Sequence, residues 1–197
     1  MMRKANVLVL GALIALGLSS CIKDGETFDW RAQYEIEKPI IEEYAKTHMN
    51  APQLHETTGI WYEIVSPGET GSFTYKASFP TVYVNYVGEL LNGDEFDSDD
   101  SAAGAKFSIS NNGIIPAWQI AFFPKEIKFD EKGEPLDKPI EFGGITSEGL
   151  QKGAVIKFVT PSYLAYGQQN SNTVPANSPL YFEVKVIDIE DPSGTGN

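Results

Sequence analysis

Short segments in which apolar and polar residues alternate, between residues 58 and 190, restrict the possible fold more than any other feature of the chain. Such alternation is typical of strands with one buried face. Only "IIPAWQIAFF" predicts a helix, because Pro116 suits a first helical turn and Pro124 ends it. Many short strands and one short helix predict an antiparallel α+β domain with the helix packed on the sheet. The last predicted strand, 180–190, has an apolar face made of Leu180, Phe182, Val184 and Val186.

The stretch "NYVGELLNGDEFDS", residues 85–98, predicts a hairpin whose Asn-Gly pair favours a type I′ turn. The register places Asp97 opposite Gly88 and diagonal to Tyr86 on one face, where a tyrosine hydroxyl can reach a carboxylate. Strict alternation sends Phe96 to the other face. We therefore expect a bend or bulge near Gly88 if Phe96 is to share a pocket with them.

The first twenty residues have the organisation of a secretory signal peptide. Two basic residues, Arg3 and Lys4, precede the apolar run "ANVLVLGALIALGL", which is too short for a transmembrane helix. The run is followed by "LSSC", which resembles a bacterial lipobox, and Cys21 is the only cysteine of the chain. We expect Cys21 to become a lipidated N-terminus, whose several acyl chains anchor the protein in a membrane. An ordinary secretory signal with an incidental cysteine is the alternative.

Residues 21–57 are polar and charged, and we expect them to link the anchor to a folded domain of residues 58–190. Within the linker, "KPIIEEYAKTHM" predicts a short helix with Pro39 near its first turn. Both histidines, His48 and His55, are expected to be solvated polar residues. We expect the tail, 191–197, to be disordered.

The composition argues against several classes of function. The chain has a formal net charge of −12, and removing residues 1–20 takes away two basic residues and no acidic ones, which leaves −14. A surface this acidic, without a basic stripe that holds aromatic residues, argues against a nucleic-acid partner. With one cysteine and two histidines, a zinc site of His and Cys ligands is not expected, and no nucleophile-elbow motif is present. We therefore expect no metal and no cofactor.

A stretch at about 122–148 is rich in Lys, Glu, Pro and Gly and interrupts the pattern of the domain. Its centre, "EIKFDEKGEPLDKPIEF", predicts a hairpin that turns at Lys132-Gly133. We interpret it as a surface insertion, which costs little stability. A flap that binds a partner is the alternative.

Three segments follow the hairpin in the order "GIIPAW" (113–118), "LAYG" (164–167) and "NTVPANSPLYFEV" (172–184). Together with the hairpin, their order and spacing resemble the FKBP family of peptidyl-prolyl cis–trans isomerases, over roughly residues 58–190 apart from the insertion. The resemblance implies a twisted antiparallel sheet wrapped around one short helix. It also implies isomerase activity on the X–Pro bonds of polypeptides, by desolvation and positioning in an aromatic pocket.

The resemblance assigns this pocket to particular residues. Trp118 would form its floor, and Asp97 would lie at the rim, hydrogen-bonded to the Tyr86 hydroxyl. Tyr166 and the Ile115 N–H would hold the carbonyl groups of the substrate, so that catalysis would rest on Tyr86, Asp97, Ile115 and Tyr166. The other residues that would contact the substrate are Phe96, Ile114, Val174 and Phe182. The residues expected to belong to the ordinary core are Phe107, Phe158 and Val184.

The sequence departs from the family pattern at two alanines. Ala117 replaces the glycine before the tryptophan, and Ala105 stands where the family usually has a pocket phenylalanine. The loop around Asn170-Ser171 also lacks an aromatic residue or a histidine. We therefore expect a pocket that is wider and less apolar on one side, which affects macrolide binding more than isomerase activity.

The leading hypothesis is thus a prolyl isomerase that acts on extracytoplasmic polypeptides and is lipid-anchored, in the outer membrane of a Gram-negative bacterium. The alternative is a non-catalytic chaperone or binding module on the same fold, whose insertion holds its clients. Ala105 and the insertion favour the alternative. The residues that favour the enzyme are Tyr86, Asp97, Ile115, Trp118 and Tyr166.

Overall fold

A seven-stranded antiparallel sheet dominates the part of the chain that the computed structural model describes, residues 28–110, 113–171 and 173–192. The strand order is β1-β2-β8-β9-β3-β4, and β5 also pairs with β3. The predicted signal peptide and Cys21 lie outside the described residues. The strands of this sheet are β1 (Gln53–His55), β2 (Ile60–Ser66), β3 (Thr81–Leu90), β4 (Glu95–Asp99), β5 (Ala105–Ser108), β8 (Val155–Thr160) and β9 (Leu180–Glu190).

Strands β3 and β9 form the centre of the sheet, and they show why the alternating sequence folds in this way. Along β3 every second side chain from Val82 to Gly88 is buried, which places Val84 and Tyr86 on the core face. Along β9 the four residues of the predicted apolar face are all buried, as expected for period-two burial. The sequence-based prediction of these strands is therefore confirmed.

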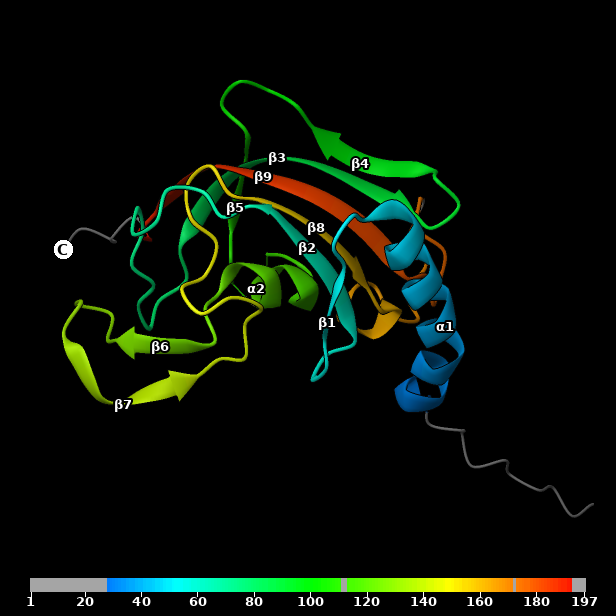
Figure 1. Cartoon of the computed structure of the whole chain (residues 1–197), viewed down its shortest axis with the longest axis horizontal. Coiled ribbons are helices and arrows are strands. Elements are labelled where there is room, and N and C mark those ends of the chain that lie inside the picture. Colours follow the sequence, from blue (N-terminus) through cyan, green and yellow to red (C-terminus); the bar gives the residue numbers. More distant parts are fainter. Residues whose placement is uncertain (1–27, 111–112, 172, 193–197) are drawn as a thin grey trace, which may run out of the picture.

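Helix α2 (Pro116–Phe122) lies inside the curve of the sheet, beneath strands β2, β8 and β9 in Figure 1. Pro116 occupies the first turn, where its missing N–H costs no hydrogen bond. The helix buries Trp118 and Phe122 against the sheet, and these two residues join the main core cluster. The predicted architecture, a twisted sheet wrapped around one short helix, is confirmed.

Helix α1 (Trp30–His48) is longer than the sequence analysis predicted. It begins after Asp29, whose side chain caps the helix by accepting hydrogen bonds from two backbone N–H groups, and Pro39 lies inside it. The helix packs on the outer face of the sheet through a second apolar cluster. This cluster consists of Ile41, Tyr44, Ala45, Met49, Val159 and Tyr181. No helix within the described ranges is long and apolar enough to cross a membrane.

The turn between β3 and β4 also differs from its prediction. A type I′ turn needs a positive φ at both central residues, but Asn92 is not among the described residues with positive φ, whereas Gly93 has a φ of 91°. Two backbone hydrogen bonds close a three-residue loop, from Leu90 N–H to the Asp94 carbonyl (2.9 Å) and from Gly93 N–H to the Leu90 carbonyl (2.9 Å). The loop is a type I turn followed by a left-handed glycine, so only one residue needs the left-handed conformation.

The insertion forms a separate hairpin of β6 (Glu126–Phe129) and β7 (Pro135–Glu141), which projects from the domain in Figure 1. Its turn is closed by the Asp130 carboxylate, which accepts hydrogen bonds from two backbone N–H groups, and Gly133 has a φ of 86°. At its base Phe123 stacks on Phe142 with ring centroids 4.2 Å apart. The predicted hairpin is confirmed, and its role stays a prediction.

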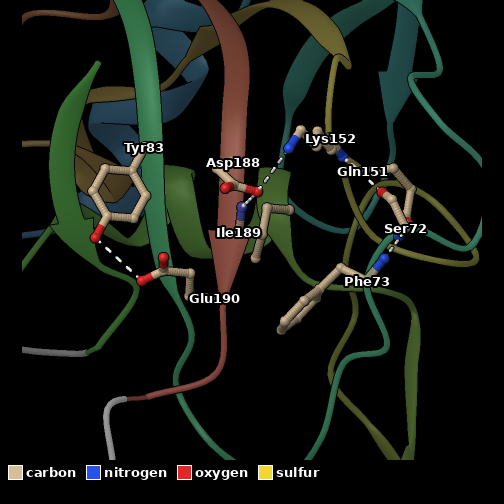
Figure 2. A network of polar contacts seen from close by, with 8 residues as sticks. All are labelled: Ser72, Phe73, Tyr83, Gln151, Lys152, Asp188, Ile189 and Glu190. Atoms are coloured by element: carbon tan, nitrogen blue, oxygen red, sulfur yellow. Dashed lines mark hydrogen bonds and ion pairs between the residues drawn. The ribbon is translucent and has the colours of Figure 1, made fainter. Parts of the chain in front are cut away.

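Polar contacts fasten the loop between β2 and β3 to the turn before β8, as Figure 2 shows. The buried Gln151 side chain accepts hydrogen bonds from Ser72 Oγ (3.3 Å) and Phe73 N–H (3.0 Å). Lys152 N–H in turn donates to Ser72 Oγ (3.0 Å). These contacts hold a long irregular loop against the end of the sheet where β9 finishes.

Candidate active site

A cavity of about 100 Å³ opens between the β3–β4 hairpin, the start of α2 and the loop that follows β8. It is smaller than the roughly 300–1,000 Å³ of a drug-sized ligand site, and its size suits a single small ring. Eight of the nine predicted pocket residues line it. The lining residues are Tyr86, Phe96, Asp97, Phe107, Gly113, Ile114, Ile115, Trp118, Tyr166 and Phe182.

Trp118 lines the cavity and is 4% exposed. Three aromatic rings meet the indole at steep angles, with centroids 5.3 Å away for Phe107, 5.4 Å for Tyr86 and 5.7 Å for Phe182. Edge-to-face pairs of this kind are favoured by the charge distribution of the rings. These three rings fix the position of the indole, and together with it they give the cavity an aromatic lining.

Phe96 reaches the pocket because of a bulge in the β3–β4 pairing. Gly88 lies opposite Asp97 but Glu89 lies opposite Glu95, so that Phe96 is the additional residue. This confirms both the predicted register and the predicted bulge. The absence of a side chain at Gly88 is essential, because a Cβ atom there would lie 2.7 Å from Phe96 Cζ. Glycine therefore leaves the space that the Phe96 ring occupies.

The rim carries a hydrogen bond between the Tyr86 hydroxyl and Asp97 Oδ2, with a distance of 2.7 Å. Burial raises the pKa of Tyr86 well above its usual value, and the hydrogen bond to Asp97 raises it further. The Tyr86 hydroxyl therefore stays protonated throughout the neutral pH range and donates a hydrogen bond to the Asp97 side chain.

Two further groups at the pocket are free to donate hydrogen bonds. The backbone of Ile115 is extended (φ −67°, ψ 148°), as is favoured before a proline, so its N–H lies outside the helix. The Ile115 N–H and the Tyr166 hydroxyl have no acceptor among the described residues. The pKa of Tyr166 is raised by burial and by the charge of Asp97, so this hydroxyl also keeps its proton.

Two residues are placed differently from the sequence analysis. Val174 was predicted to contact the substrate, but it is 2% exposed in the core and does not line the cavity. Its N–H donates to Ser171 Oγ (2.9 Å) and its carbonyl accepts from Ser171 N–H (3.0 Å), which folds this loop back and buries the side chain. Phe107 was predicted to be ordinary core, yet it lines the pocket. Phe107 lies two residues after Ala105 in β5, so the two side chains share a face of the strand. Because Ala105 was expected at the pocket, this spacing could have placed Phe107 there as well.

The loop that carries Tyr166 is held by a residue that the sequence analysis did not identify. Glu37 of α1 is 2% exposed and reaches Ser162, the first residue of the short 3-10 helix η1 (Ser162–Leu164). Its carboxylate accepts hydrogen bonds from Ser162 N–H (2.8 Å) and Ser162 Oγ (2.5 Å). The amide of Gln33 also donates to it, at 2.8 Å. Helix α1 thus fixes one side of the site.

The residues that the structure describes hold no group of three or more His, Cys, Asp or Glu side chains placed to bind a metal ion. The polar groups at the cavity are one carboxylate, two phenols and a backbone N–H. This set can orient carbonyl and amide groups by hydrogen bonding, while the aromatic rings exclude water.

The sequence is similar to known isomerases. The profile of the FKBP-type peptidyl-prolyl cis-trans isomerase family matches residues 145–187, which include η1, Tyr166 and most of β9. The FKBP-type peptidyl-prolyl cis-trans isomerase FkpA of Escherichia coli (strain K12) is 31% identical over 137 residues, which cover 68% of this chain and 39% of that protein. FkpA of Aeromonas hydrophila is 29% identical over 161 residues, which cover 79% and 48%. The chain spans less than half the length of these relatives.

Solved structures show the same fold. The crystal structure of FkpA from Escherichia coli matches with a TM-score of 0.55 at 24% identity, and covers 82% of this chain and 63% of that one. A peptidyl-prolyl cis-trans isomerase from Pseudomonas syringae pv. tomato matches with a TM-score of 0.52 at 21% identity, and covers 84% and 99%. From its sequence relatives and its fold, this chain contains an FKBP-type peptidyl-prolyl cis–trans isomerase domain.

Proposed function

We propose that this protein catalyses the cis–trans rotation of X–Pro bonds in polypeptides, and that the proline ring enters the cavity above Trp118. The observation that carries the proposal is the combination of an aromatic floor with two free hydrogen-bond donors, the Ile115 N–H and the Tyr166 hydroxyl, at one small cavity. The floor takes an apolar ring, and the donors take the carbonyl groups on either side of it.

The reaction itself explains why such a site needs no nucleophile. The barrier to rotation is roughly 18–20 kcal/mol and comes from amide resonance. Resonance separates charge along the planar amide, and water stabilises that separated charge. A pocket that excludes water favours the twisted amide, whose nitrogen has lost its conjugation. No proton has to move and no covalent bond has to form.

The hydrogen bonds supply the positioning part of catalysis. The Ile115 N–H and the Tyr166 hydroxyl hold the substrate carbonyls, so that the rotating bond lies over the pocket. The hydrogen bond between Tyr86 and Asp97 fixes the side chains of the rim. The residues that contact the substrate through their apolar surfaces are Phe96, Ile114, Trp118 and Phe182.

A protease-coupled assay on a proline tetrapeptide tests the proposal with the full chain. We expect the rate of cis–trans conversion to rise in proportion to the protein concentration. The matched variant is Tyr86→Phe, which keeps the aromatic volume and removes one hydrogen bond. If folded protein leaves the rate at its uncatalysed value, the proposed isomerase activity is refuted, and the non-catalytic chaperone or binding module is the remaining hypothesis.

The proposed location follows from the N-terminal sequence. The lipobox-like "LSSC" supports a lipid anchor at Cys21, which would hold the domain outside the cytoplasm at the outer membrane of a Gram-negative bacterium. We expect Cys21→Ala to move the protein from the membrane fraction to the soluble fraction while its thermal unfolding stays the same. Recovery of wild-type protein in the soluble fraction with a free thiol would contradict the anchor.

A further inference from the structure

A second hollow adjoins the cavity described above and shares Tyr166 with it. It has a volume of about 560 Å³ and lies between the start of α1 and the loop that follows η1. Its apolar wall consists of aromatic rings, and Gln168 and Gln169 contribute polar side chains. The aromatic residues of this hollow are Phe28, Trp30, Tyr163 and Tyr166.

The rings of this hollow leave much apolar surface in contact with water. Phe28 is 39% exposed, Trp30 is 40% exposed and Tyr166 is 37% exposed. Neighbouring exposed aromatic residues with polar groups at the edge are typical of a binding surface. Burial of these rings by a bound chain would therefore be favourable.

The hollow is built before any ligand arrives. The Trp30 ring packs on the Tyr163 ring with centroids 4.8 Å apart, and the Tyr163 hydroxyl donates to the Thr58 carbonyl at 2.7 Å. Behind them, the buried Glu37 side chain binds the backbone and the hydroxyl of Ser162. Helix α1, which carries Trp30, and the loop that carries Tyr166 are thus fixed relative to each other. A fixed surface lowers the entropy lost on binding.

We propose that this hollow is a subsite for the polypeptide that flanks the isomerised proline, and that it takes a bulky apolar side chain. The inference rests on the proposed function, because its occupant is the same chain whose proline lies above Trp118. An extended polypeptide advances by about 3.3 Å per residue. Since Tyr166 belongs to both cavities, a side chain within two or three residues of the proline reaches the hollow. Trp30 and Tyr163 thereby make the enzyme select apolar flanking residues.

The test compares two proline peptides that differ only in their flanking positions, with leucine or phenylalanine in one and alanine in the other. For the full wild-type chain we expect a higher kcat/KM for the bulky peptide. Trp30→Ala should lower the ratio of the two kcat/KM values by about threefold to tenfold, the effect of about one aromatic contact, through KM rather than kcat. Trp30→Phe should restore most of the ratio.

The matched control is Ile36→Ala, because Ile36 lies on the same helix, is 64% exposed and does not line the hollow. It should leave both kcat/KM values at their wild-type level. Equal values for both peptides in wild-type protein, or an unchanged ratio in folded Trp30→Ala, would overturn the subsite while the isomerase stands. Wild-type protein that accelerates neither peptide would overturn the isomerase itself, and the subsite with it.

Discussion

Replacement of Gly88 by alanine tests how the pocket is assembled, because it adds a single carbon atom between two of the pocket's rings. The added Cβ atom would lie 2.7 Å from Phe96 Cζ and 3.0 Å from Phe182 Cε1. Gly88 is not among the glycines with a positive φ, so its backbone conformation is open to alanine. In the folded state, the cost of the substitution therefore comes from the crowding and not from backbone strain.

The size of the effect follows from these distances. Carbon atoms pack best at about 3.5–4.0 Å, so the Phe96 ring has to move by about 1 Å. Overpacking of this kind costs roughly 1–3 kcal/mol, and alanine recovers about 0.5 kcal/mol by restricting the unfolded chain. We expect Gly88→Ala to lower the free energy of unfolding by about 0.5–2.5 kcal/mol, the difference between these two contributions. A displacement of about 1 Å at the site should also lower kcat/KM at least about tenfold.

Denaturant unfolding and the protease-coupled assay measure both effects, and Phe96→Leu supplies the control. Leucine lacks the ring edge that meets the new carbon, so Gly88→Ala should cost far less stability in the Phe96→Leu background. We expect a coupling energy of at least about 1 kcal/mol between the two substitutions. Additive effects, or wild-type stability and kcat/KM in Gly88→Ala, would refute the packing of Phe96 over residue 88.

Three further predictions concern hydrogen bonds. Tyr86→Phe removes the rim hydrogen bond, and Asp97→Asn replaces its charged acceptor with a neutral amide oxygen. Both substitutions keep the side-chain volume, so each should lower kcat/KM without abolishing it in the peptide assay. The pKa values of Tyr86 and Tyr166 are both raised, so both phenols stay protonated and kcat/KM should be constant from about pH 6 to 9. A bell-shaped pH profile of kcat/KM that disappears in Asp97→Asn would instead indicate acid–base chemistry. Glu37→Ala leaves buried donors unpaired, so it should lower the free energy of unfolding, measured with denaturant, by about 3 kcal/mol. The control is Glu42→Ala on the exposed side of the same helix. Because the partner of Glu42 is a surface lysine, this control should lower the free energy of unfolding by less than about 1 kcal/mol.

The strands and the short helix could be predicted from the sequence because their burial follows a local period. Strand β9 occupies the predicted residues, 180–190, and the pairing of Gly88 with Asp97 agrees with the register predicted from the turn at Asn92-Gly93. The turn type was wrong because an Asn-Gly pair also suits a longer loop in which only the glycine is left-handed. Local sequence does not distinguish these two loops.

Helix α1 was predicted too short because the one buried residue of its first half is Glu37, and glutamate usually faces water. Trp30, Tyr34, Glu37 and Ile41 follow each other at helical spacing, but Glu37 interrupts the apolar pattern. Its burial depends on Ser162, which is 125 residues away in the chain. In the pocket, Val174 was predicted to line the cavity and Phe107 to lie in the core, whereas the structure buries Val174 and places Phe107 at the cavity beside Trp118. Such long-range partners are not visible in a local pattern.

The early start of α1 determines how far the domain can stand from a membrane. Residues 21–57 were expected to be a linker with one short helix, but Phe28 already lines a hollow of the folded domain. If Cys21 carries the lipid, Phe28 follows it by seven positions in the chain, and a segment of that length spans at most about 25 Å. The domain would then work close above the bilayer, with the hollow at the start of α1 on the tethered side. Its clients would be polypeptide segments that pass near the membrane surface, within the distance that this short linker spans.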